Sequence, residues 1–126
     1  LCFGTFGGWP RFAPETLERT IELANAIHAV AARPIDWMHI PALDTLDEAF
    51  YAPLRSLAVG DARIYLGLIH SMESFAERYR IARAYLPAFG LGAYCGFGRL
   101  EPEQVEGVFE DHLRALSIAR SCGCAD

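Results

Sequence analysis

The sequence predicts an α/β fold, and more closely the C-terminal half of a TIM barrel, the closed (β/α)8 fold in which a helix follows each parallel strand. Three observations lead to this prediction. Short apolar runs alternate four times with amphipathic segments, as the strands of a parallel sheet alternate with their covering helices. The runs begin near residues 1, 35, 63 and 90, and this period of 27 to 34 residues matches one βα unit. The length of 126 residues is that of four units, because eight units take ~250 residues.

We therefore expect residues 1–126 to form a single partial domain of four βα units with parallel strands. It should be a piece of a longer protein and should need the missing N-terminal half of the barrel. An open, doubly wound sheet is the alternative. However, Gly4, Gly7 and Gly8 are spaced wrongly for a dinucleotide-binding turn after the first strand.

The first two units follow from apolar runs, prolines and helical spacing. Residues 1–6 form a short apolar run that glycine-rich turn chemistry ends, which predicts the first strand. Pro14 opens the first helix, because the first helical position needs no N–H group, and Pro34 ends it. A compact strand is expected over residues 35–40, and a helix interrupted by a proline over residues 44–57.

The last two units repeat this pattern. Residues 63–69 are almost entirely apolar and follow a Gly-Asp turn, so they predict a strand that is buried on both faces. A helix is expected over residues 74–86, where a proline closes it, and a strand over residues 90–95. A proline also opens the last helix, which is expected over residues 102–120.

Composition excludes several classes of protein. All 11 basic residues are arginines, against 16 acids, and the formal net charge of -5 argues against nucleic acid as a partner. The absence of lysine excludes a Schiff-base or phosphate-loop lysine within this stretch. No apolar run approaches the ~18 residues of a membrane span, and four unevenly placed cysteines do not form a secreted disulfide pattern. We expect a cytoplasmic protein that has neither a membrane nor a nucleic acid as its partner.

Residues that can bind metal fall at the ends of the expected strands. Cys2 lies in the first strand, His39 near the end of the second, His70 directly after the third, and Cys95 at the end of the fourth. In a barrel these ends meet at one mouth, where the active site lies. Each residue also has a purely structural interpretation, since cysteine and histidine are frequent in protein cores.

The segment from Cys95 to Arg99 indicates a binding site. Two glycines let the backbone approach a ligand closely, and Arg99 can bind a carboxylate. Thiolates from distant strands, together with nitrogen or oxygen ligands, suit Zn²⁺ with one position open for substrate. A zinc ion held in this way lowers the pKa of a substrate thiol and keeps it nucleophilic.

These motifs resemble the catalytic C-terminal barrel of cobalamin-independent methionine synthase, within the uroporphyrinogen decarboxylase/methionine synthase-like superfamily. Cys2 matches the cysteine of that family's His-x-Cys pair, and the histidine would precede Leu1. Residues 68–71, Leu-Ile-His-Ser, are similar to its Asp-Ile-His-Ser segment, so His70 matches the histidine regarded as the proton donor. Residues 94–99, Tyr-Cys-Gly-Phe-Gly-Arg, are similar to the phrase that contains its last zinc cysteine.

The resemblance implies a divergent zinc-dependent methyltransferase. Its zinc would be held by Cys2, Cys95 and His39, the last in place of the family's glutamate. The metal would activate a small-molecule thiol as methyl acceptor, with His70 as the catalytic acid. The methyl donor would be folate-like, with Trp9 and Arg99 binding substrate.

Two other hypotheses stay open. The first is a metal-free, decarboxylase-like or other small-molecule site, in which Arg99 holds a substrate carboxylate and His70 acts as acid. The second is that the half-barrel is inactive by itself and associates through its sheet edges. Trp9 and its aromatic neighbours could stack on a planar ligand such as a pterin, or simply pack.

Overall fold

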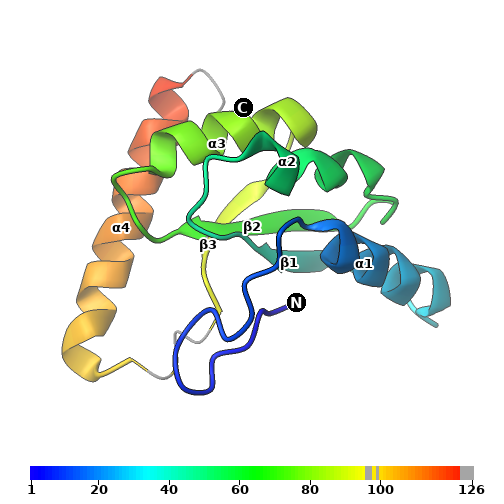
Figure 1. The fold of residues 1–126 in the computed structure, drawn as a ribbon, viewed down its shortest axis with the longest axis horizontal. Helices are drawn as coiled ribbons and strands as arrows, with labels where there is room; N and C mark the ends of the chain where they lie inside the picture. The colour runs from blue at the N-terminus through cyan, green and yellow to red at the C-terminus, as the bar shows by residue number, and fades with distance from the viewer. Residues whose placement is uncertain (96–97, 99, 123–126) are drawn as a thin grey trace.

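The computed structural model describes residues 1–95, 98 and 100–122 (Figure 1). In chain order, its elements are α1 (Glu18–Val30), β1 (Trp37–Pro41), α2 (Glu48–Tyr51), the 3-10 helix η1 (Ala52–Ser56), β2 (Arg63–Ile69), α3 (Phe75–Tyr85), β3 (Gly90–Ala93) and α4 (Pro102–Ser121). Within the described residues, no helix combines the length and the apolar character that crossing a membrane requires.

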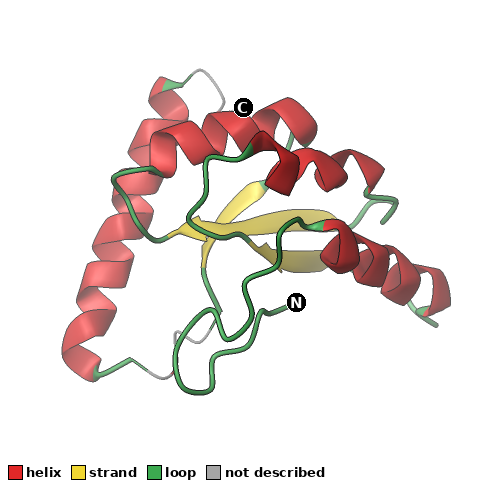
Figure 2. Ribbon diagram, in the orientation of Figure 1, coloured by secondary structure: helices red, strands yellow, loops and turns green. Residues whose placement is uncertain are grey.

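Three parallel strands form one open sheet in the order β1-β2-β3. Helices α2, η1 and α3 lie over one face of this sheet, and α4 stands beside β3 (Figure 2). The prediction of four βα units forming half of a TIM barrel is wrong, because the described chain has three strands in an open sheet.

The missing strand is the one expected over residues 1–6. This segment lies at the outer edge of β1, where the Leu1 amine donates a hydrogen bond to the carbonyl oxygen of His39 at 2.8 Å. At Gly4 the backbone takes φ +81° and turns away, and main-chain bonds from Phe12 to Phe3 and from Arg11 to Gly4 close a loop. Phe3 is buried in the core, so the apolar run is explained by burial of a loop end rather than by strand pairing.

Strand alternation gives the sheet two different faces. Ile64, Leu66 and Leu68 of β2 are buried with the helices, as is Ile40 of β1. The opposite face carries Trp37, His39 and Tyr65, with Gly67 and Gly92 beside the His39 ring. Trp37 and Tyr65 meet edge to face with ring centroids 6.2 Å apart, and Trp37 is 61 % exposed.

The helix expected over residues 44–57 is shorter than predicted. Asp47 caps α2 by accepting a hydrogen bond from the Ala49 N–H at 2.9 Å, and Pro53 turns the chain into the 3-10 helix η1. Residues 42–46 thereby remain an irregular connection after β1. This connection supplies Leu43 and Asp44 to the pocket described next.

Candidate functional site

A pocket of about 550 Å³ lies at the carboxyl ends of the three strands. Its lining comes from the N-terminal loop and from the segments that follow each strand: Trp9, Pro10, Ala13, Leu43, Asp44, His70, Ser71 and Tyr94. A hollow of similar volume, about 600 Å³, lies at the amino ends of β2 and β3. Its lining includes no histidine, cysteine, aspartate or glutamate residue. Because ligands of parallel α/β sheets bind beyond the carboxyl ends of the strands, the first pocket is the candidate site.

His70 is held in one neutral tautomer. Its Nε2 atom lies 2.8 Å from the carbonyl oxygen of Ala42, which can only accept, and 3.3 Å from Nη1 of Arg78, which can only donate. The shorter contact assigns the proton to Nε2. The lone pair is therefore on Nδ1, which lies 3.4 Å from the Ser71 hydroxyl. Burial, and then the positive charge of Arg78, lower the pKa of His70 from its ordinary value of 6.5. At neutral pH His70 is thus an uncharged base with a free nitrogen lone pair at the pocket.

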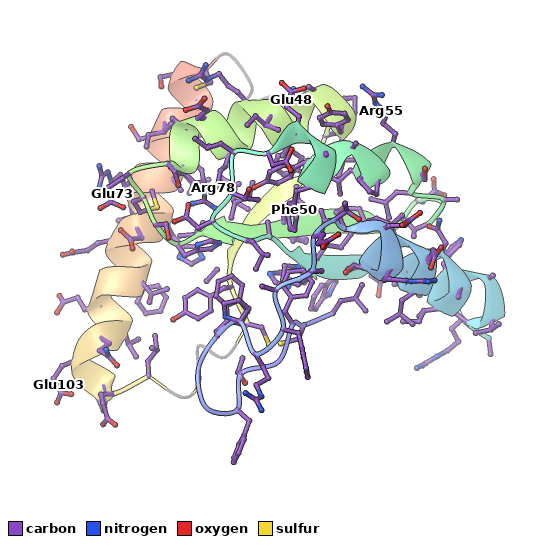
Figure 3. The ribbon with its side chains drawn as sticks, viewed as in Figure 1. Glu48, Phe50, Arg55, Glu73, Arg78 and Glu103 are labelled. Atoms are coloured by element: carbon purple, nitrogen blue, oxygen red, sulfur yellow. The ribbon has the colours of Figure 1, made fainter. Side chains whose placement is uncertain are left out.

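Arg78 of α3 organises the turn that carries His70. Its side chain is fully buried between α3 and the end of β2 (Figure 3). The guanidinium donates hydrogen bonds to the carbonyl oxygens of Leu68 at 3.1 Å, Ser71 at 3.1 Å and His70. Ser71, a residue with a side chain, has a φ of +43°, and these bonds hold the backbone in that unfavourable conformation.

Asp44, which follows β1, adds a carboxylate to the pocket lining. It accepts a short hydrogen bond from the Ser74 hydroxyl at 2.6 Å, and its Oδ1 lies 3.5 Å from Nε of Arg78. The hydrogen bond from Ser74 is the main cause that lowers the pKa of Asp44, with further contributions from Ser71 and Arg78. Asp44 is therefore ionised at neutral pH and remains half exposed to a ligand.

Two aromatic side chains complete the pocket. The Trp9 ring lies 4.8 Å from that of Tyr94 and 5.0 Å from that of His70, measured between centroids. The Trp9 Nε1 atom is buried and has no hydrogen-bond partner among the described residues. A buried donor without a partner is uncommon in folded proteins. The prediction that Trp9 binds substrate thus stays a prediction, with the ring in a position to do so.

The predicted metal ligands lie in different surroundings. Cys2 is exposed, and its sulfur accepts a hydrogen bond from the Gly4 N–H at 3.2 Å. Cys95 is half-buried and follows β3. Among the described residues, no three His, Cys, Asp or Glu side chains lie close enough together to hold a metal ion. The zinc site of Cys2, Cys95 and His39 therefore stays a prediction.

His39 instead connects the strands of the sheet. Its Nε2–H donates to the carbonyl oxygen of Ala93 in β3 at 2.9 Å, so the ring spans β2. This path is open because Gly67 and Gly92 lie beneath the ring. A Cβ atom at either glycine would come within 3.0 to 3.3 Å of ring atoms. Burial lowers the pKa of His39 and keeps the ring neutral.

The sequence reasoning missed Arg78 and Asp44 as site residues. A signal for Arg78 exists, because it lies on the face of α3 that Phe75, Tyr79 and Ala82 bury in the core. A charged residue on a core-facing stripe must have partners, which the strand-end carbonyls provide. Arg99, predicted to bind a carboxylate, lies outside the described residues.

Comparison of the chain with protein-family models, curated proteins and solved structures finds no match. The resemblance to the methionine synthase-like superfamily therefore stays a prediction. The function is argued below from the pocket itself.

Proposed function

We propose that the pocket at the carboxyl ends of β1, β2 and β3 is a small-molecule site in which His70 takes a proton from the bound ligand. The observation that carries the proposal is the 2.8 Å contact between Nε2 of His70 and the Ala42 carbonyl oxygen, which favours the tautomer with a basic Nδ1. This is the metal-free alternative among the hypotheses from the sequence, with His70 acting first as a base rather than as an acid.

The lining supports a planar ligand that carries N–H donors. Trp9 and Tyr94 offer aromatic surfaces on which a flat ring can stack. Asp44 is an ionised acceptor, and the N–H of Trp9 is a donor in need of an acceptor. A nitrogen heterocycle with an amino group and a ring nitrogen or carbonyl, such as a pterin, matches all three.

The charges around His70 favour return of the proton. Accepting a proton at Nδ1 creates an imidazolium whose Nε2 lies 3.3 Å from Nη1 of Arg78, and this like-charge approach makes the protonated state short-lived. Asp44 acts in the opposite sense, because its negative charge favours the imidazolium. Because the two charges act in opposite senses, His70 can accept a proton from the ligand and release it again.

The test is a binding titration with 6-methylpterin as probe, in a Trp37→Phe background that leaves Trp9 as the single tryptophan. We expect quenching of Trp9 fluorescence and a shift of the His70 ring resonances in NMR spectra. Asp44→Asn and His70→Gln should weaken binding at least tenfold. His112→Gln, on α4 and outside the pocket lining, is the matched control and should not change the affinity. Equal affinities for all four proteins, or no binding at millimolar probe, would contradict the proposal.

Zinc-dependent methyl transfer to a thiol is the second candidate. It is favoured by the exposed thiol of Cys2, on a segment that the Leu1 amine ties to His39 of β1. Elemental analysis of the purified protein, with Cys2→Ser and Cys95→Ser variants, tests it directly. Stoichiometric zinc that is lost in both variants would support this candidate. Zinc-free wild-type protein, or unchanged zinc in both variants, would reject it.

A further inference from the structure

Helix α4 has apolar side chains on two of its faces. On one face, Ala115 and Ala119 are buried against the rest of the protein. On another face, Phe109, Leu113 and Leu116 are 58 %, 70 % and 45 % exposed. Their spacing of four and three residues places them in one stripe along the helix, which we call the α4 stripe.

The charges along α4 are separated by sign. Glu103, Glu106 and Glu110 lie in its first half, and Arg114 and Arg120 in its second half; all five are exposed. Figure 3 shows Glu103 at the end of α4 that extends away from the sheet. Among the described residues, none of the five is in an ion pair. The exposed side of α4 is thus acidic at one end and basic at the other, with the α4 stripe between.

We propose that two copies of this chain associate through their α4 stripes, with the two helices antiparallel about a twofold axis near Leu113. The helical repeat places Glu106 and Arg120 on the side of α4 that carries the stripe, and in this register Glu106 of one copy lies opposite Arg120 of the other. Phe109 of each copy meets Leu116 of the other. The surface is therefore complementary to itself, as a twofold interface requires.

The charged residues select the antiparallel arrangement. A parallel pair would set acidic halves side by side and basic halves side by side, which costs free energy through like-charge repulsion. The 20-residue helix is ~30 Å long, and one such helix pair buries less than the ~800 Å² per partner of a standard interface. We therefore expect a reversible dimer with a dissociation constant on the order of micromolar.

The test is sedimentation velocity of the 126-residue chain over a concentration series that spans the micromolar range. We expect a monomer–dimer equilibrium, and we expect Leu113→Glu to weaken it at least tenfold. Leu23→Glu is the matched control, because Leu23 of α1 is 51 % exposed and lies outside the stripe. Circular dichroism and thermal unfolding check that each variant keeps the fold.

Charge reversal tests the orientation. Glu106→Arg should weaken the dimer, and adding Arg120→Glu should restore it, because the reversed pair is again complementary across the axis. Three results would overturn the proposal. The first is a monomer at all concentrations. The second is a dimer that Leu113→Glu does not weaken, as expected for association through the edge of β1, and the third is a double variant that dimerises no more tightly than Glu106→Arg alone.

Discussion

Replacement of Arg78 by methionine tests how the candidate site is held together. Methionine fills much of the volume of the arginine stem but donates no hydrogen bond, so the carbonyl oxygens of Leu68, His70 and Ser71 lose their guanidinium donor. A buried acceptor without a partner costs ~1–3 kcal/mol. The cost here is smaller, because the Leu68 carbonyl still accepts from the His70 N–H at 2.9 Å and the Ser71 carbonyl from the Ser74 N–H at 3.1 Å. The partly buried His70 carbonyl can bind water instead.

Two further contributions reduce this cost, and the expected loss in unfolding free energy is about 1–2 kcal/mol. Asp44 is half exposed, so loss of its cationic neighbour leaves no buried charge alone. Removal of a fully buried guanidinium also ends its own desolvation cost. A loss of this size is a large part of the ~5–15 kcal/mol that stabilises a typical domain.

Urea unfolding measures the loss, with Arg80→Met as matched control. Arg80 lies two residues further along α3 and is exposed, so its replacement should change the unfolding free energy by less than about 0.5 kcal/mol. Arg78→Lys is a milder variant that keeps the positive charge but cannot reach three carbonyls with one fork. Its unfolding free energy should lie between those of Arg78→Met and the wild type.

A second measurement separates the site from general stability. The positive charge of Arg78 contributes to the lowered pKa of His70, so Arg78→Met should raise that pKa in an NMR titration, while burial still keeps it below 6.5. Arg78→Lys should raise it less. The reasoning is refuted if Arg78→Met costs no more than Arg80→Met and leaves the His70 titration unchanged.

Two further predictions concern the histidines and the glycine beneath one of them. The pKa values of His39 and His70 are lowered in the folded protein, so the unfolded chain binds protons first and stability should fall as the pH drops from about 7.5 to about 5. Urea unfolding across that range should show a smaller change of the unfolding free energy with pH for His39→Gln and for His70→Gln than for the wild type. An equal change in all three proteins would refute the lowered pKa values. Gly67→Ala would place a Cβ 3.0 Å from the His39 ring and 3.1 Å from a β3 carbonyl oxygen, and should cost about 1–3 kcal/mol. Gly107 lies in an exposed part of α4, with no atom within 4 Å of an added Cβ, so Gly107→Ala should instead stabilise the protein by about 0.5–1 kcal/mol. A similar change in unfolding free energy at both glycines would contradict the packing of the His39 ring.

Several elements could be predicted from local sequence. The strand expected over residues 63–69 matches β2 (Arg63–Ile69), and the last helix expected over 102–120 matches α4 within a residue. A continuous apolar run and a proline at the first helical position are local signals, which is why they suffice. The run at residues 1–6 carries a similar apolar signal and forms no strand. Strand formation needs a partner along the whole edge, and Gly4 turns the chain away from β1.

The candidate site, too, could be predicted from the sequence only in part. That His70 lies at a site could be expected from its position directly after an apolar strand. The gathering of Cys2, His39 and Cys95 around one metal depended on a closed barrel, and the open sheet does not bring about this arrangement among the described residues. His39 illustrates this, because its ring donates a hydrogen bond to the Ala93 carbonyl oxygen within the sheet.

By itself, then, the amino-acid sequence determined the alternation of parallel strands and helices and the placement of a histidine after the central strand. Hydrophobic periodicity and proline position act over a few residues, so the chain expresses them without reference to its other parts. Only the tertiary structure decided the number of strands, the tautomer of His70 and the burial of Arg78. Each of these depends on contacts between groups far apart in sequence, such as the Ala42 carbonyl and the His70 ring. No local sequence pattern indicates that such groups come into contact.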